Sequence, residues 1–178
     1  RGMASGTQLV IAHGTDKRAE ISDLARLNAA SDPAVLGYWL EMEPDGLDGK
    51  DADFARNWPQ GEPDADGLKT FVATLSPAQK VSTDAGRASV YWTRATSGDV
   101  TLQHAVGNEN DLKVSGPDAE KYYVAAHDRG DELMFEPYDD DVSGKRVLMT
   151  SLMVPIKVDG QFRGVAGADI SLDAIQAS

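Results

Sequence analysis

Residues 136–172, which read EPYDDDVSGKRVLMTSLMVPIKVDGQFRGVAGADISL, decide the fold class of this chain. From residue 134 onward there are three runs typical of β-strands, at 134–139, 146–158 and 161–170, separated by Ser143-Gly144 and Asp159-Gly160. Asp-Gly is a strong hairpin signal, because both central residues of the tight turn need positive φ. The second run is mostly apolar, as expected of a largely buried strand. The stretch therefore predicts a three-stranded antiparallel meander.

Three residues predict irregularities within this meander. Pro155 has no amide hydrogen to donate, so it predicts an edge or a bulge in the second strand. Gly164 and Gly167 have no side chain, so they predict that another group approaches the third strand closely.

The chain before the meander predicts a mixture of helices and strands. Apolar residues fall mostly on one face of residues 7–28, which predicts one amphipathic helix that ends before Pro33. Residues 34–43, 89–94 and 100–106 predict strands, residues 118–129 predict a helix, and residues 68–75 fit either. This order predicts an α+β domain with a central antiparallel sheet.

Several pieces of the C-terminal half occur in an order that resembles a known family. They are Tyr122-Tyr123-x-x-Ala126, Pro137-Tyr138-x-Asp140, Val154-Pro155-Ile156, Asp159-Gly160-x-Phe162 and Gly167-x-Asp169-Ile170-Ser171-Leu172. Together they resemble the C-terminal half of a Cache domain, a PAS-like extracellular sensor module of bacterial chemoreceptors, sensor kinases and cyclic-dinucleotide enzymes. The resemblance covers residues 122–178 best and is looser before them.

The resemblance implies a fold, a location and a class of function. The fold is α+β, with a PAS-like antiparallel sheet (33–178) packed on a long N-terminal helix (1–32) in a single Cache-like domain. The implied location is the periplasmic or extracellular part of a longer inner-membrane receptor, with a possible homodimer through the N-terminal helix. The implied function is non-enzymatic binding of a small polar metabolite for a methyl-accepting chemotaxis receptor, and the alternative is a small-carboxylate-binding sensor of a histidine kinase.

The composition excludes several other classes of protein. The 178 residues, 41% of them hydrophobic, suffice for one domain with a sizeable core. A formal net charge of −12 argues against nucleic acid and against docking on an anionic membrane. The chain has no cysteine, which excludes disulfides, thiol catalysis and cysteine-bound zinc. We expect no cofactor, and membrane contact only through segments outside this chain.

The family resemblance also implies a ligand-binding set. It places an aromatic pair on Tyr122 and Tyr123, a strand pair on Tyr138 and Asp140, and a second carboxylate on Asp169. Two carboxylates among aromatic rings would hold an ammonium group through charge-assisted hydrogen bonds, and each ring face would add about 0.5–2 kcal/mol.

One position departs from the family pattern. Glu120 stands where the family has an arginine that binds a ligand carboxylate. Either Arg94 replaces that cation, or the ligand is an amine without a carboxylate.

The strand predicted at 89–94 carries three further candidates. Alternation places Trp92 and Arg94 on one face of the strand and Tyr91 on the other. An arginine beside an aromatic ring could clamp an anion, although Arg94 could equally be a surface residue beside a core aromatic. Tyr91, Trp92 and Arg94 therefore join the predicted ligand-binding set, and both amine and small-carboxylate ligands stay open.

Metal binding and catalysis find less support. Residues 139–144 match the start of a calcium loop, but Thr150 stands where a glutamate is required and Arg146 where an apolar residue is expected. No histidine has a partner at metal-ligand spacing, and no nucleophile elbow or phosphate-binding loop is present. We predict no metal and no catalytic residue. The alternative is an acidic hydrolase that uses Asp140, Asp169 and a histidine.

Overall fold

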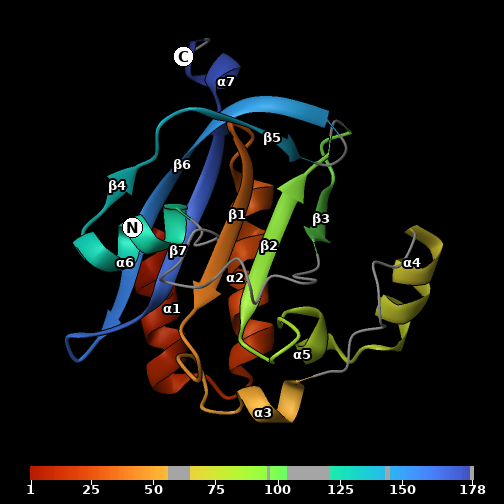
Figure 1. The fold of residues 1–178 in the computed structure, drawn as a ribbon, viewed down its shortest axis with the longest axis vertical. Coiled ribbons are helices and arrows are strands. Elements are labelled where there is room, and N and C mark those ends of the chain that lie inside the picture. Colours follow the sequence, from red (N-terminus) through yellow and green to blue (C-terminus); the bar gives the residue numbers. More distant parts are fainter. Residues whose placement is uncertain (56–64, 96, 104–120, 143–144, 177–178) are drawn as a thin grey trace.

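The computed structural model describes residues 1–55, 65–95, 97–103, 121–142 and 145–176 (Figure 1). Its centre is an antiparallel sheet with the strand order β3-β2-β1-β7-β6-β4, and β5 also pairs with β6. The strands are β1 (Val35–Met42), β2 (Ser89–Arg94), β3 (Val100–Gln103), β4 (Leu133–Met134), β5 (Tyr138–Val142), β6 (Lys145–Val158) and β7 (Gln161–Ser171).

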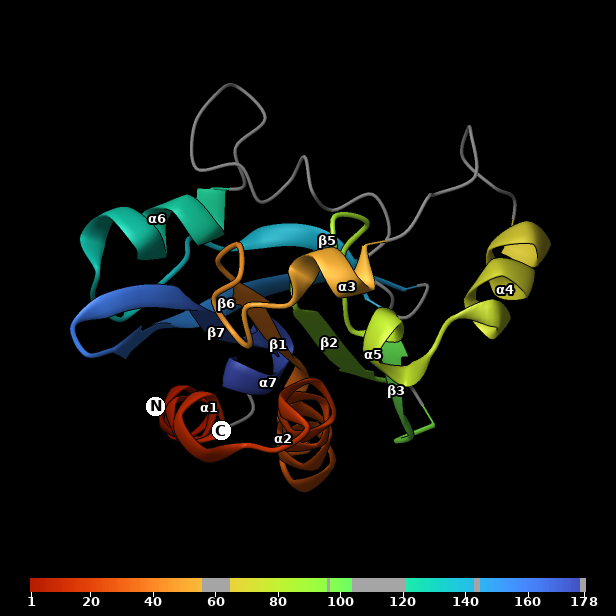
Figure 2. The same ribbon diagram turned by 90° about the horizontal axis from the view of Figure 1, so that it is seen from below.

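Helices lie on both faces of this sheet. They are α1 (Gly2–His13), α2 (Lys17–Ser31), α3 (Asp51–Phe54), α4 (Ala65–Thr74), α5 (Pro77–Lys80), α6 (Lys121–Arg129) and α7 (Leu172–Gln176). Helices α1 and α2 lie side by side on one face, and α6 lies on the opposite face (Figures 1 and 2). None of the described helices combines the length and the apolar character needed to cross a bilayer.

The prediction of a single helix for residues 7–28 is wrong, because the structure has two helices there, α1 and α2. Helix α1 ends at Gly14, whose amide donates to the carbonyl of Val10 and whose ψ of 141° leaves the helical region. The Glu20 carboxylate then accepts the amides of Thr15 (2.8 Å) and Asp16 (3.0 Å), and Asp16 accepts the amide of Ala19. These contacts cap a new helix, α2, just after residues 13–18, a stretch that contains no large apolar residue.

The meander is confirmed, with one division that was not predicted. Strands β6 and β7 form a long hairpin around Asp159-Gly160, whose φ angles of 52° and 77° are those of the predicted tight turn. The run predicted at 134–139 is divided into β4 and β5, with Pro137 between them. Residues 143–144, the other predicted turn, lie outside the described residues.

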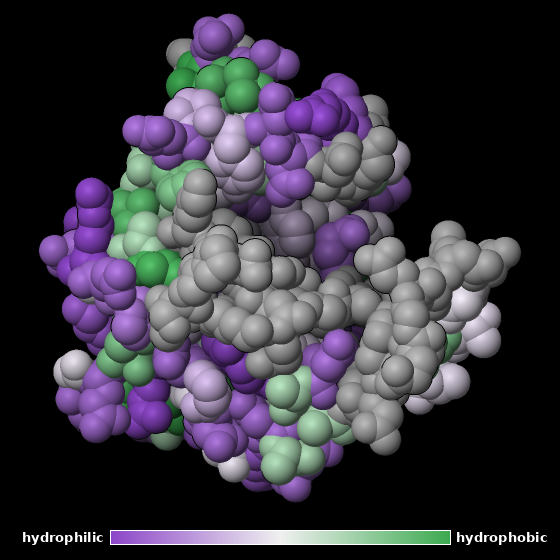
Figure 3. All heavy atoms as spheres, viewed as in Figure 1, coloured by the Kyte–Doolittle hydropathy of each residue, from purple (hydrophilic) through white to green (hydrophobic). Residues whose placement is uncertain are grey.

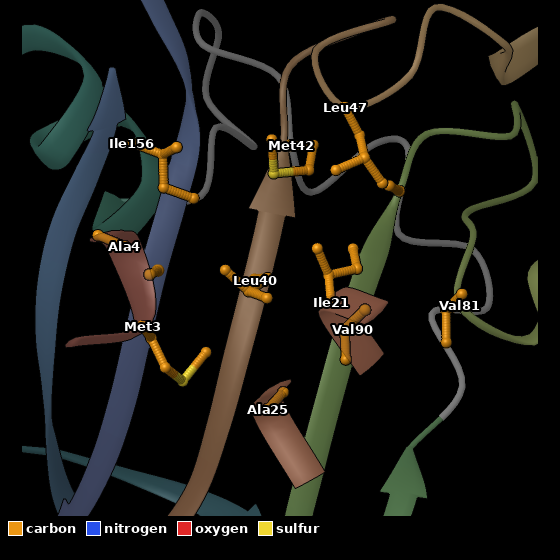
Figure 4. Packing of buried hydrophobic residues seen from close by; sticks show 12 residues of the cluster. Met3, Ala4, Ile21, Ala25, Leu40, Met42, Leu47, Val81, Val90 and Ile156 are labelled. Atoms are coloured by element: carbon orange, nitrogen blue, oxygen red, sulfur yellow. The ribbon is translucent and has the colours of Figure 1, made fainter. Parts of the chain in front are cut away.

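The main hydrophobic core lies between the sheet and the pair α1 and α2 (Figure 4). Leu40, Val90 and Ile156 project from three strands and are fully buried. Ile21 and Ala25 of α2 meet them from the helix side and are also fully buried. Each such large apolar side chain contributes about 1.5–3 kcal/mol on burial, so this layer holds the helices against the sheet.

A second, smaller apolar cluster lies on the other face of the sheet. Its buried members are Trp39, Tyr123, Ala126, Met153 and Val165. Tyr123 and Ala126 belong to α6, so this cluster fixes α6 over β6 and β7.

The described surface is hydrophilic over most of the face in Figure 3, with hydrophobic atoms over α7 and beside β4. The large exposed apolar residues there include Met134, with 64% of its surface exposed, and Ile175, with 46%.

The helices and the seven-stranded antiparallel sheet together confirm the predicted α+β class and its central antiparallel sheet.

Candidate ligand-binding site

Asp169 is the centre of a polar cluster on the sheet face that α6 covers. Its side chain is 3% exposed. Oδ1 of Asp169 accepts hydrogen bonds from Trp39 Nε1 (3.0 Å) and Ser151 Oγ (2.7 Å), and the Tyr91 hydroxyl also donates to this carboxylate. Burial raises the pKa of Asp169 above its ordinary value although these three donors lower it, and the charge of Asp140 raises it further.

The register of three strands brings these residues together. Asp169 on β7 lies opposite Ser151 on β6 and Gly37 on β1, and Trp39 follows two residues further along β1. The Trp39 ring lies over Gly167, where an added Cβ would be only 1.9 Å from the ring. The close approach predicted at Gly167 is therefore confirmed, and the approaching group is an indole.

Tyr138 on β5 joins the cluster through Ser151. The Tyr138 hydroxyl and Ser151 Oγ are 2.7 Å apart, and the Tyr138 ring meets Phe135 edge-on at 5.7 Å. Asp140, also on β5, is exposed, and its negative charge raises the pKa of both Tyr91 and Asp169. We call Trp39, Tyr91, Tyr138, Ser151 and Asp169 the Asp169 cluster.

Tyr123 belongs to the smaller apolar cluster, together with Trp39 of the Asp169 cluster. It is fully buried, and its hydroxyl donates to Glu43. Its ring meets Phe162 edge-on at 6.1 Å, and the Arg87 guanidinium carbon lies 5.9 Å from its centroid. Burial, followed by the bond to Glu43, raises the pKa of Tyr123. Tyr123 therefore anchors α6, and the side chain of Tyr122 and Glu120 lie outside the described residues.

Trp92 and Arg94 face α2, on the other side of the sheet from Tyr91, as alternation predicted. Trp92 Nε1 donates to Ser22 Oγ at 3.1 Å. Arg94 donates to three carbonyls at the end of α2, which are those of Ala29, Ala30 (3.2 Å) and Asp32 (3.3 Å). The structure therefore separates Arg94 from the Asp169 cluster, and the geometry gives no support to its prediction as an anion clamp.

The cluster contains two residues that were absent from the predicted set. Trp39 and Ser151 both hydrogen-bond Asp169. Gly167 was the available signal for Trp39, because a glycine in a strand indicates that a bulky group covers it. Ser151 had no comparable signal, since its place depends on the exact register of β6 and β7.

Metal chemistry has no counterpart in the described residues. Within them, no group of three or more histidine or acidic side chains is arranged to hold a metal ion. The triplet 139–141, considered above as part of a calcium loop, lies in strand β5 and pairs with β6.

The fold is a PAS-like antiparallel sheet with α1 and α2 on one face and, on the face that α6 covers, a buried carboxylate among aromatic rings, which is the architecture of a sensor-type domain. A family described as "Methyl-accepting chemotaxis protein-like, first PDC sensor domain" matches residues 63–177. This chain belongs to that family.

Individual relatives agree with this assignment. The methyl-accepting chemotaxis protein TlpQ of Pseudomonas aeruginosa is 32% identical over 165 residues, which are 91% of this chain and 20% of TlpQ. A solved structure titled "Methyl-accepting Chemotaxis protein X" is 22% identical, with a TM-score of 0.69 over 99% of this chain and 54% of that one.

The extracellular domain of a histidine kinase, mmHK1S-Z3, is also similar, with 22% identity and a TM-score of 0.66 over 99% of this chain and 51% of that domain. The chain thus spans about a fifth of TlpQ and about half of each solved chain. At this identity the two structures bear on the fold alone.

The family membership confirms several predictions. The chain is an extracytoplasmic sensor domain of the kind found in chemoreceptors and histidine kinases, and its family binds ligands without catalysis. The hydrolase alternative is therefore wrong.

Proposed function

We propose that this chain is the ligand-sensing domain of a transmembrane chemoreceptor, and that its Asp169 cluster binds the ammonium group of a small polar metabolite. The observation that carries the proposal is the state of Asp169. Its carboxylate is buried and accepts neutral donors, but within the described residues it forms no ion pair with a lysine, arginine or histidine.

A buried carboxylate without a counter-ion is costly, and a bound cation would remove that cost. An ammonium group is a compact cation with three donors, which suits the oxygens of Asp169, Tyr91 and Tyr138. The charge of Asp140 adds to the attraction. An amine or an amino acid meets these demands.

A small-carboxylate sensor of a histidine kinase is the weaker candidate. A carboxylate ligand needs a cation, and Arg94 donates to carbonyls at the end of α2 instead. The same ligand would also meet the negative charges of Asp140 and Asp169 at short range.

Binding at Tyr91 would reach α2 through strand β2. Tyr91 donates to Asp169 on one face of β2, while Trp92 and Arg94 hold α2 on the other. A displacement of β2 on ligand binding would therefore shift α2 and bias the receptor between two pre-existing states. Comparing hydrogen exchange of α2 amides with and without a bound amine tests this step. Unchanged exchange would contradict it.

The homodimer through the N-terminal helices remains part of this proposal. Leu9 of α1 is 64% exposed and Leu27 of α2 is 56% exposed, so the pair presents apolar side chains to solvent. Sedimentation of the wild type and of a Leu9→Glu, Leu27→Glu double variant tests it. A dimer that the substitutions leave intact would place the interface elsewhere.

A thermal-shift screen against amines, quaternary ammoniums, amino acids and short carboxylates tests the ligand class. A ligand at about a hundred times its Kd adds roughly 2.7 kcal/mol, which is on the order of 5–10 °C for a domain of this size. We expect shifts from compounds with an ammonium group and none from plain carboxylates.

Two variants make the screen specific to the Asp169 cluster. Asp169→Asn should abolish the shift. Asp139→Asn removes the same charge from an exposed position on β5, next to Tyr138 but on the opposite face, and should preserve the shift. A carboxylate hit, or an amine hit that survives Asp169→Asn, would overturn the proposed site.

A further inference from the structure

We infer that Ser151 and Trp39 are positioning residues of the Asp169 cluster: Ser151 directs the Tyr138 hydroxyl hydrogen inward and Trp39 donates to the carboxylate that receives these hydrogens, so that the cluster offers an incoming ligand acceptor oxygens only. This inference deepens the proposed function, on which its consequence for the ligand rests, because it states how the site selects a hydrogen-donating group.

The direction of the chain of hydrogen bonds follows from counting donors. An ionised carboxylate can only accept, and a serine hydroxyl has one hydrogen. Ser151 gives that hydrogen to Asp169 Oδ1 at 2.7 Å. The contact of 2.7 Å between Ser151 and Tyr138 therefore needs the Tyr138 hydroxyl as its donor. The Tyr138 hydroxyl donates its single hydrogen to Ser151. Its oxygen can therefore only accept a hydrogen bond from any further group.

The same count applies to the other side of Asp169. The indole of Trp39 is a donor only, and it gives its hydrogen to Oδ1 at 3.0 Å. The absence of a side chain at Gly167 lets the ring take that position. Tyr91 also donates its hydrogen to Asp169, so its oxygen too is left as an acceptor.

This orientation has a consequence for the chemistry of the ligand. A group that meets the oxygens of Tyr91 and Tyr138 must bring its own hydrogens, as an ammonium does. A carboxylate or a carbonyl brings none, and it would face lone pairs. The site would then reject a carboxylate or a carbonyl because of the orientation of the Tyr91 and Tyr138 hydroxyls as well as because of the negative charge of the site.

Ser151→Ala tests the orientation without any ligand. The C–O stretching band of a tyrosine reports whether its hydroxyl donates or accepts, and Tyr138→Phe assigns the band of Tyr138. We expect a donor-type band in the wild type and its loss in Ser151→Ala. The control is Ser89→Ala, which removes another buried serine hydroxyl that donates to a carboxylate, Glu41, at 2.9 Å on the same sheet face. An acceptor-type band in the wild type, or an unchanged band in Ser151→Ala, would overturn the inference.

Trp39→Phe tests the second positioning residue. Trp92→Phe is the control, because Trp92 donates to Ser22 of α2 on the opposite face of the sheet. The carboxyl titration of Asp169 is followed by carbon NMR. Loss of the Trp39 donor should move the Asp169 titration to higher pH, and Trp92→Phe should leave it in place. An unmoved titration in Trp39→Phe would overturn the role of Trp39.

Three probes of similar size connect the orientation to selectivity: n-butylammonium, n-butanol and butyrate. We expect the wild type to prefer the ammonium to the alcohol and to reject butyrate. Ser151→Ala should reduce the ammonium-to-alcohol affinity ratio about tenfold, the equivalent of one ordinary hydrogen bond. An unreduced ratio would contradict the inference. If no probe binds, the proposed ligand class fails, and the tyrosine band and the Asp169 titration still decide the orientation.

Discussion

Two buried charged residues of this domain, Arg18 and Asp169, differ in whether their hydrogen-bond partners carry the opposite charge. Arg18 on α2 is 1% exposed and makes five hydrogen bonds, which go to Asp48, Asp51, Ser82 and the carbonyl of Gly86. Two of its partners are carboxylates, and its guanidinium lies 4.1 Å from the Phe54 ring centroid. We call these residues the Arg18 hub. Asp169 is almost as deeply buried, but its described partners are all neutral.

The causes of the pKa shifts express this difference, because Arg18 acts to lower the pKa of both of its carboxylates and no described cation does so for Asp169. Burial opposes the ionisation of Asp48, but hydrogen bonds and charge from Arg18 outweigh it and hold the pKa of Asp48 below its ordinary value. Burial raises the pKa of Asp51, and its bonds to the Asp45 amide and Arg18 offset only part of that. Burial likewise raises the pKa of Asp169, where no Arg18 counterpart is among the causes. The Arg18 hub contains the opposite charges that its members need, whereas no described cation pairs with Asp169, and we propose that a ligand supplies one.

The largest effect is expected from breaking the Arg18 hub. Arg18→Met leaves Asp48 and Asp51 buried without their cation and should lower the free energy of unfolding by about 3–5 kcal/mol. Urea denaturation measures it. Arg26→Met is the control, since Arg26 is 40% exposed and pairs with an exposed Asp23, and it should change stability by no more than about 0.5 kcal/mol. A loss below about 1 kcal/mol in Arg18→Met would remove the distinction between the two regions.

A smaller loss is expected from crowding the Asp169 cluster. In Gly167→Ala the new Cβ would overlap the Trp39 ring, and we expect a loss of about 1–3 kcal/mol together with a change in indole fluorescence. Gly2→Ala is the matched control, because an added Cβ there would meet nothing within 4 Å. If Gly167→Ala proves as stable as the wild type with the same fluorescence, Trp39 is not held where the structure places it.

The smallest expected effect is a gain in the free energy of unfolding, in contrast to the two losses above. Asp169→Asn removes the buried charge and should raise the free energy of unfolding by about 0.5–2 kcal/mol at pH 8 while abolishing amine binding. Because the folded pKa of Asp169 lies above its ordinary 3.8, the wild type gains stability from this group at low pH and loses it as pH rises through the raised pKa. The advantage of Asp169→Asn should therefore be smaller at pH 5 than at pH 8.

Urea denaturation of Asp169→Asn at both pH values, beside Asp139→Asn, measures this effect. A variant less stable than the wild type at pH 8 would show that Asp169 stabilises the fold and is not a cost held for a ligand.

Much of the fold was predictable because it depends on local signals. The Asp159-Gly160 turn, the alternation along β2 and the apolar run of β6 each act over a few residues. The break between α1 and α2 was missed although Gly14 lies in a stretch, residues 13–18, without a large apolar residue. The contacts that fix the break there are those of the Glu20 side chain with the amides of Thr15 and Asp16, which a pattern of apolar positions does not encode. The division between β4 and β5 was missed although Pro137 marks it.

The site was predictable in part. Tyr91, Tyr138 and Asp169 do meet in one cluster, and Asp140 influences it electrostatically. Arg94 and Trp92 were correctly placed on the opposite face of β2, where both hydrogen-bond residues of α2. Tyr123 lies in the apolar cluster under α6.

The sequence by itself determined the class of fold, the meander and the family, because tight turns, alternation and ordered motifs are local features of the chain. Only the tertiary structure decided what surrounds Asp169. Counting outward from Val158 and Gln161 would place Asp169 opposite Thr150, whereas the irregularity between Ile156 and Lys157 shifts the pairing by one residue and brings Ser151 there. Since a shift of one residue exchanges the two faces of a strand, that single bulge places a donor beside the buried carboxylate.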